Sequence, residues 1–134
     1  MHTKHIHVQW YDDNHTIIRQ HISAAWETEE WLQAAQNVAK MAEAQNHEVS
    51  VIVDYAPDVD MNRIPDGMLH ALNDLPEHPL VQEDSIACVA VVGLSGQLAL
   101  VDRIFQRIHK PHKSVRVSTL DEALQMIEQG LVEI

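Results

Sequence analysis

The sequence predicts an α/β domain with a mixed sheet, in which an N-terminal β-hairpin is followed by alternating helices and strands. Three observations predict this fold. Two short N-terminal segments alternate polar and apolar residues, which is typical of strands. Helical periods and short apolar runs then follow one another along the chain. The 134 residues are 46% hydrophobic and contain no linker or low-complexity run, so we expect a single domain over residues 1–134.

The hairpin and the first helix come from the first third of the chain. Residues 5–10 and 16–22 alternate as strands do, and the polar segment 11–15 between them is typical of a turn. Thr28 can cap a helix that runs to about Gln45. Four residues recur on one face of that helix and are expected to lie on the sheet: Trp31, Ala35, Val38 and Ala42.

Two apolar runs predict the middle of the sheet. The β-branched run Val49–Tyr55 indicates a strand that is covered on both faces or buried centrally, and a helix from about residue 66 to 75 is expected after it. Residues 85–92 form the most apolar run of the chain and predict a second central strand, which ends at Gly93.

A further helix, a short strand and a last helix complete the predicted order. Ser95 can cap the first of these helices, residues 114–117 indicate the strand, and Thr119 with Glu122 predicts a capping box for the last helix. Apolar residues at helical spacing after Ser95 are expected to face the core: Leu98, Val101, Ile104, Phe105 and Ile108.

Charge and motif content exclude several classes of function. A net charge of −11 disfavours nucleic acid and anionic membranes as partners, because both need clustered cations. No apolar run reaches membrane-spanning length and no secretory leader is evident, so we expect a cytoplasmic protein. Cys88 lies in an apolar run and is expected to be a buried small hydrophobe. There is no Gly-x-Ser-x-Gly elbow and no glycine-rich phosphate loop, so we expect neither an enzyme nor a cofactor.

The order of elements, with Asp54 at the end of a central strand and Gly67-Met68 opening a helix, resembles the STAS domain of bacterial anti-anti-sigma factors. In that family the helix opens with a motif like Asp-Ser-Ser-Gly-Leu, and a partner kinase that is also the anti-sigma factor phosphorylates a serine there. Here Pro65 and Asp66 hold the two serine positions. The resemblance therefore implies the fold and a docking surface, but not the phosphorylation.

Asp66 allows three interpretations. It supplies a fixed negative charge where the family carries a phosphoryl group, so the chain either mimics a permanently modified state or has lost the regulation. The third interpretation needs no function, because Pro65 in a first turn and Asp66 as a cap are what helices ordinarily favour.

We therefore expect a non-catalytic protein-interaction or regulatory module of the STAS type, which docks an unidentified protein partner through the loop and helix after the central strand. Apolar residues beside a charged rim are typical of docking surfaces, although some of these must belong to the core. The candidate contact residues are Asp60, Met61, Ile64, Pro65, Asp66, Gly67, Met68 and Leu69.

Two other functions remain open. The alternative to a docking module is a domain that binds a small ligand (a nucleotide, an anion or a lipid) with the strand ends and the turn containing Gly93, Ser95 and Gly96, since glycines before a helix let phosphate approach backbone N–H groups. Self-association is the other, because Trp26 and Trp31 can bury in a homodimer interface or in the core.

Two clusters of potential metal ligands are not expected to bind a metal. His5 and His7 share one face of the first strand, and His21 lies on its hairpin partner, but no cysteine or carboxylate completes the set at ligand spacing. Four aspartates follow the central strand, on a single loop that we expect to be a solvated turn and not a magnesium site: Asp54, Asp58, Asp60 and Asp66.

Overall fold

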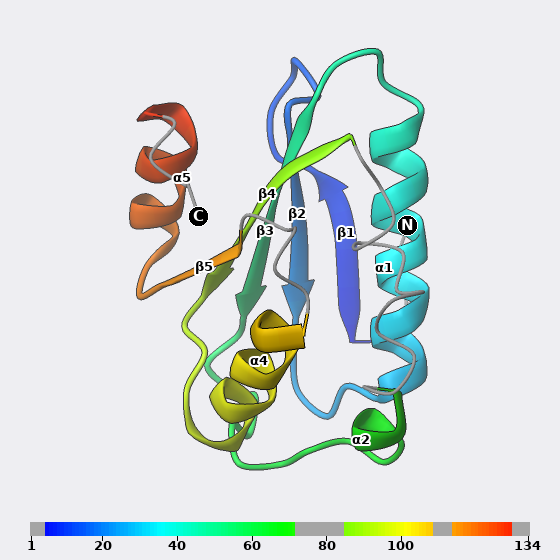
Figure 1. The fold of residues 1–134 in the computed structure, drawn as a ribbon, viewed down its shortest axis with the longest axis vertical. Helices are drawn as coiled ribbons and strands as arrows, with labels where there is room; N and C mark the ends of the chain where they lie inside the picture. The colour runs from blue at the N-terminus through cyan, green and yellow to red at the C-terminus, as the bar shows by residue number, and fades with distance from the viewer. Residues whose placement is uncertain (1–4, 72–84, 109–113, 130–134) are drawn as a thin grey trace.

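The computed structural model describes residues 5–71, 85–108 and 114–129. Its strands form one five-stranded sheet in the order β1-β2-β3-β4-β5, in which β1 is antiparallel to β2 and the other neighbours are parallel (Figure 1). The predicted mixed sheet is thus confirmed, with the run Val49–Tyr55 at its centre. The strands are β1 (Ile6–Trp10), β2 (Ile17–Ile22), β3 (Val49–Tyr55), β4 (Ile86–Val92) and β5 (Ser114–Val117).

Helices cover both faces of the sheet (Figure 1). The described helices are α1 (Thr28–Glu43), α2 (Met68–Ala71), α4 (Gly96–Ile108) and α5 (Leu120–Gln129). Val38 of α1, Met68 of α2 and Leu98 of α4 pack in one core cluster, and Ala123 of α5 packs in a second one. Alternate residues of β3 enter the two clusters, with Val51 in the first and Ile52 in the second. This explains why β3 is apolar almost throughout, because a strand covered on both faces has no solvent side.

The first helix confirms the predicted face but not the predicted cap. Ala35, Val38 and Ala42 are buried, and Trp31 is half-buried against the core. Thr28 is the first helical residue and is buried, whereas the N-cap is Glu27. Glu27 caps the helix because its carboxylate accepts from the N3 backbone N–H while the N3 residue, Glu30, accepts from the Glu27 N–H, which is a reciprocal capping box. The helix ends at Glu43, two residues before the predicted end.

The second helix begins later than predicted. Residues 65–67 form a turn, in which the Pro65 carbonyl accepts from the Met68 N–H at 3.1 Å and Gly67 has a φ of +83°. Helix α2 therefore starts at Met68 and not at residue 66, because that left-handed conformation favours glycine and interrupts helical geometry. Residues 72–75 of the predicted helix lie outside the described part of the chain.

The second half of the chain follows the prediction closely. Helix α4 starts directly after Ser95, Leu98 is buried and Val101 packs against the core, while the side chains of residues 104–108 lie outside the described ones. At α5, the Thr119 hydroxyl accepts from the Glu122 N–H at 3.2 Å and donates to the Glu122 carboxylate at 3.4 Å. Thr119 is thus the cap, although the Glu122 side chain reaches its hydroxyl and not its backbone.

Candidate functional site

The segment that connects β3 to α2, residues 56–67, is named here the docking loop. It runs past the N-terminal ends of α1 and α4, beyond the carboxyl ends of β2 and β3 (Figure 1). Tertiary hydrogen bonds join the loop to both helices. These bonds give the loop a defined conformation although none of its residues belongs to a helix or strand.

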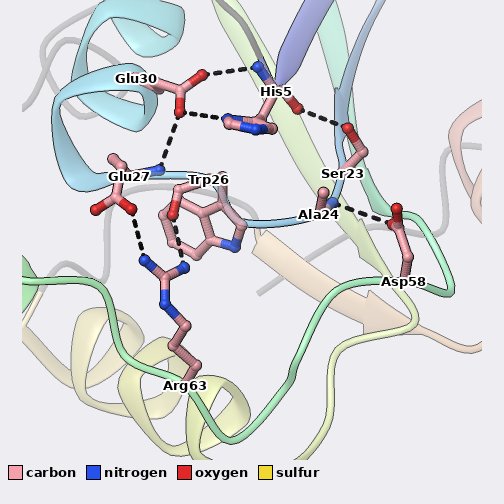
Figure 2. Close-up of polar contacts among 8 residues, drawn as sticks. All are labelled: His5, Ser23, Ala24, Trp26, Glu27, Glu30, Asp58 and Arg63. Atoms are coloured by element: carbon pink, nitrogen blue, oxygen red, sulfur yellow. Dashed lines mark hydrogen bonds and ion pairs between the residues drawn. The ribbon is translucent and has the colours of Figure 1, made fainter.

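Three hydrogen bonds hold the docking loop to residues 24–27, which lead into α1 (Figure 2). The Arg63 guanidinium donates to the Trp26 carbonyl oxygen at 2.9 Å and to the Glu27 carboxylate at 2.6 Å. The Asp58 carboxylate accepts from the Ala24 N–H at 3.0 Å. The charge-assisted bonds from Arg63 are of the stronger kind, and they connect the loop to the residue that caps α1.

The first strand is joined to the same corner through Glu30 (Figure 2). Its carboxylate accepts from the His5 N–H at 2.8 Å and contacts the His5 ring nitrogen Nδ1 at 2.9 Å, in addition to its bond from the Glu27 N–H. Ser23 donates to the His5 carbonyl oxygen at 3.1 Å. These hydrogen bonds therefore connect three element ends that lie next to the docking loop: the start of β1, the end of β2 and the start of α1.

Two further contacts hold the docking loop to the start of α4. The Met61 carbonyl accepts from the Leu98 N–H at 3.0 Å, and the Asn62 side-chain oxygen accepts from the Gln97 N–H at 3.3 Å. The first N–H groups of a helix have no intrahelical partner, so the loop supplies partners that capping side chains usually provide. Ser95 precedes the helix as predicted, and its carbonyl accepts from the Ala99 N–H at 3.1 Å.

Gly96 makes this approach possible. A Cβ atom at this position would lie 2.5 Å from the Asn62 side-chain oxygen and 3.0 Å from the Met61 carbonyl oxygen, and Gly96 also has a φ of +57°. The turn of the small-ligand alternative is therefore adjacent to the docking loop. The loop accepts hydrogen bonds from the N–H groups of Gln97 and Leu98. These two donors are therefore already engaged at the place where the small-ligand alternative would bind an anion.

The candidate contact residues divide into exposed and buried ones. Leu69 is 60% exposed, whereas Pro65 and Met68 are buried. Met61 and Ile64 are half-buried and pack against the core. Of the five apolar candidates, Met68 belongs to the core cluster and Pro65 is also buried, so part of the set is not available for docking, as expected. The polar candidates Asp60 and Asp66 are exposed, and so is Gly67.

Asp54 is not part of this surface, because its side chain lies on the sheet face that α5 partly covers. It is buried and accepts from Arg19 Nε at 2.9 Å and Arg19 Nη2 at 2.7 Å, and it contacts His21 Nδ1 at 2.8 Å. Burial alone would raise the pKa of Asp54, but the hydrogen bonds from Arg19 and His21 and their charges outweigh it, so the pKa is lowered. The cluster of Arg19, His21 and Asp54 was not predicted from the sequence.

The predicted aspartate cluster does not converge. Asp54 faces β2, Asp58 accepts from Ala24, and Asp60 accepts from the Asn62 N–H at 2.9 Å. Among the histidines, His7 lies opposite His21 in the β1–β2 pair, while the His5 ring turns to Glu30 on α1. In residues 5–71, 85–108 and 114–129, no group of three or more His, Cys, Asp or Glu side chains is arranged to hold a metal ion.

Three other residues singled out in the sequence have structural places. Cys88 is buried, and its thiol donates to the Ser50 hydroxyl at 3.3 Å. Trp26 is a core residue whose ring centroid lies 6.4 Å from that of Tyr55, and Trp31 packs half-buried against the same core. Desolvation of the Tyr55 phenol, together with the charge of Asp102, raises its pKa, so this phenol stays neutral at pH values where an exposed tyrosine ionises. Trp26 is thus accounted for by the core.

Comparison of the chain with protein-family models, with curated proteins and with solved structures finds no match in any of the three. The STAS resemblance therefore stays a prediction that depends on the order of elements and on Asp54, Gly67 and Met68. Across the described residues, none of the helices has the length and apolar character needed to span a bilayer.

Proposed function

We propose that this protein is a non-catalytic, regulatory protein-interaction module that binds a partner through the docking loop and α2. The observation that carries the proposal is the attachment of one loop to two helix ends, by Arg63 on α1 and by Met61 and Asn62 on α4. A surface loop that is ordered before binding loses little conformational entropy on binding, and this saving favours recognition.

The exposed residues of the same region have the character of a contact surface. Leu69 projects its side chain to solvent, and Ile64 and Met61 lie half-buried beside the core. An exposed leucine on α2, with half-buried apolar residues and exposed aspartates on the docking loop before it, supplies the residue types of the apolar centre and polar rim of protein interfaces. The element order that resembles a STAS domain supports the same surface, and it implies a regulatory role in a bacterial cytoplasm.

A photo-crosslinking experiment followed by affinity measurement tests this function. A photoreactive phenylalanine analogue at position 69 captures the partner in cells, and the partner is then purified and titrated. We expect Leu69→Asp to weaken the affinity by about 30-fold or more, as charged substitutions at the centre of an interface do. The circular dichroism of the variant should match that of the parent, because Leu69 is largely exposed.

Tyr11→Asp is the matched control. Tyr11 is another large hydrophobic residue that is exposed, at 42%, and it lies in the hairpin turn away from the docking loop. Its substitution is expected to change the affinity by less than about twofold. A partner whose binding is insensitive to Leu69→Asp, or is lost with Tyr11→Asp, would show that the docking surface lies elsewhere.

A further inference from the structure

The charges that the docking loop presents outward have one sign. Arg63 is the only lysine or arginine among residues 56–67, and its guanidinium is turned inward to the Trp26 carbonyl and the Glu27 carboxylate. Three aspartates of the same segment are exposed: Asp58, Asp60 and Asp66. The cation of the loop is therefore used within the fold, and its carboxylates face the solvent.

The carboxylates alternate along the chain with the apolar residues of the surface. Asp60 directly precedes Met61, and Asp66 lies between Ile64 and Leu69 in the chain. The Asp60 carboxylate accepts from the Asn62 N–H through Oδ1, which limits its movement. The cap residue Glu27, whose side chain is 51% exposed, adds a carboxylate at the α1 end of the loop, where its charge is shared with Arg63.

We propose that the part of the partner that binds here is a basic amphipathic peptide segment, in which apolar side chains are flanked by lysine or arginine. This inference rests on the proposed function. Its apolar side chains contact Leu69, Ile64 and Met61, and its cations lie near Asp60 and Asp66. Charges of opposite sign across an interface raise the association rate and select among partners, while like charges disfavour the wrong ones. An acidic segment would meet this rim and a chain with a net charge of −11.

Selection from a displayed library of random 12-residue peptides tests the inference with the full chain. The library is selected on the protein in low salt, and each enriched peptide is then measured against the Leu69→Asp variant. We expect the enriched peptides to combine two or more apolar residues with an excess of lysine and arginine. Affinity for such a purified peptide is expected to fall about fivefold in an Asp60→Asn/Asp66→Asn variant, because exposed ion pairs contribute modestly.

A second variant controls for net charge. Asp13→Asn/Glu128→Gln also removes two negative charges, but from exposed positions on the hairpin turn and on α5. We expect it to change the affinity for the peptide by less than about twofold. Raising the salt concentration should weaken peptide binding to the parent protein and have less effect on the Asp60→Asn/Asp66→Asn variant.

The outcomes separate this inference from the function on which it rests. Enriched peptides that require Leu69 but are neutral or acidic would overturn the basic partner and retain the docking surface. No enrichment, or enrichment that is indifferent to Leu69, would overturn both. Binding of a labelled oligonucleotide or of phosphatidylserine vesicles that requires Leu69 would also overturn the peptide partner, since either would place a polyanion on this surface.

Discussion

Replacing Ile52 by alanine is expected to lower the free energy of unfolding by about 3 kcal/mol, within the range measured for such truncations in protein cores. Ile52 lies in the middle of β3, is fully buried, and packs with Ala90, Val92 and Ala123 between the sheet and α5. Urea denaturation followed by tryptophan fluorescence measures the change, and the slope of the transition should stay the same.

Leu69→Ala is the matched control for this truncation. It also removes an aliphatic side chain, but from an exposed position, so the expected change is within about 0.5 kcal/mol. A loss below about 1 kcal/mol for Ile52→Ala would mean that α5 does not cover this face of β3. Such a result would contradict the position of β3 at the centre of the fold.

Replacing Arg19 by methionine is expected to cost about 2 to 3 kcal/mol at neutral pH. The substitution leaves the Asp54 carboxylate buried without its bidentate partner, and breaking a buried ion pair from one side commonly costs 3 to 5 kcal/mol. The side chains are 28% exposed at Arg19 and 11% exposed at Asp54, so solvent screening reduces the effect. Equilibrium unfolding in urea at pH 7 measures it.

The same variant should change the dependence of stability on pH. The pKa of Asp54 is lowered in the folded protein, so the folded state favours the ionised carboxyl group. The stabilisation is therefore fully present above the ordinary carboxyl pKa of 3.8 and is lost as the pH falls toward the folded value. The difference in stability between the parent and Arg19→Met should shrink below about pH 4.

Arg116→Met controls for the loss of a surface cation. Arg116 Nε lies 3.6 Å from Asp102 Oδ2, which is longer than either hydrogen bond from Arg19 to Asp54, and the Arg116 side chain is 34% exposed, so the expected cost is at most about 1 kcal/mol. The role assigned to the Asp54 cluster would be contradicted if both arginine substitutions lowered the free energy of unfolding equally. It would also be contradicted if the loss of stability in Arg19→Met were the same at pH 7 and at pH 3.

Much of the fold could be predicted because the periodicity of apolar residues is a local property of the sequence. The runs Val49–Tyr55 and 85–92 are apolar on both faces, and the structure places them third and fourth in the sheet. The face of α1 with Ala35, Val38 and Ala42 follows in the same way from helical spacing. Burial imposes these patterns directly, and they can therefore be recognised without the tertiary structure.

The contacts of the candidate site could not be predicted, because they join residues that are far apart in the chain. Nothing local indicates that Arg63 reaches the cap of α1 or that Asn62 meets the N-terminus of α4. The sequence suggests Gly96 as a glycine that lets phosphate approach. In the structure its missing side chain instead lets the docking loop approach the N-terminus of α4.

Asp54 is a partial exception to this limit. Arg19 and His21 alternate with Ile18 and Gln20 along β2, so they share one face of the strand, and an aspartate at the end of an apolar neighbouring strand is a plausible partner for them. That signal was present in the sequence, but it depended on knowing that β2 and β3 are parallel neighbours. From the sequence, Asp54 was instead grouped with the acidic residues that follow it in the chain, Asp58, Asp60 and Asp66.

Amide hydrogen exchange at Gln97 and Leu98 tests most directly whether the docking loop is held in a fixed conformation. These N–H groups lie in the first turn of α4 and have no intrahelical acceptor, so protection depends on Asn62 and Met61. We predict exchange at least about tenfold slower than in a free peptide, and loss of that protection in Gly96→Ala. Exchange at the free-peptide rate in the parent protein would contradict the loop attachment and, with it, the proposed docking surface.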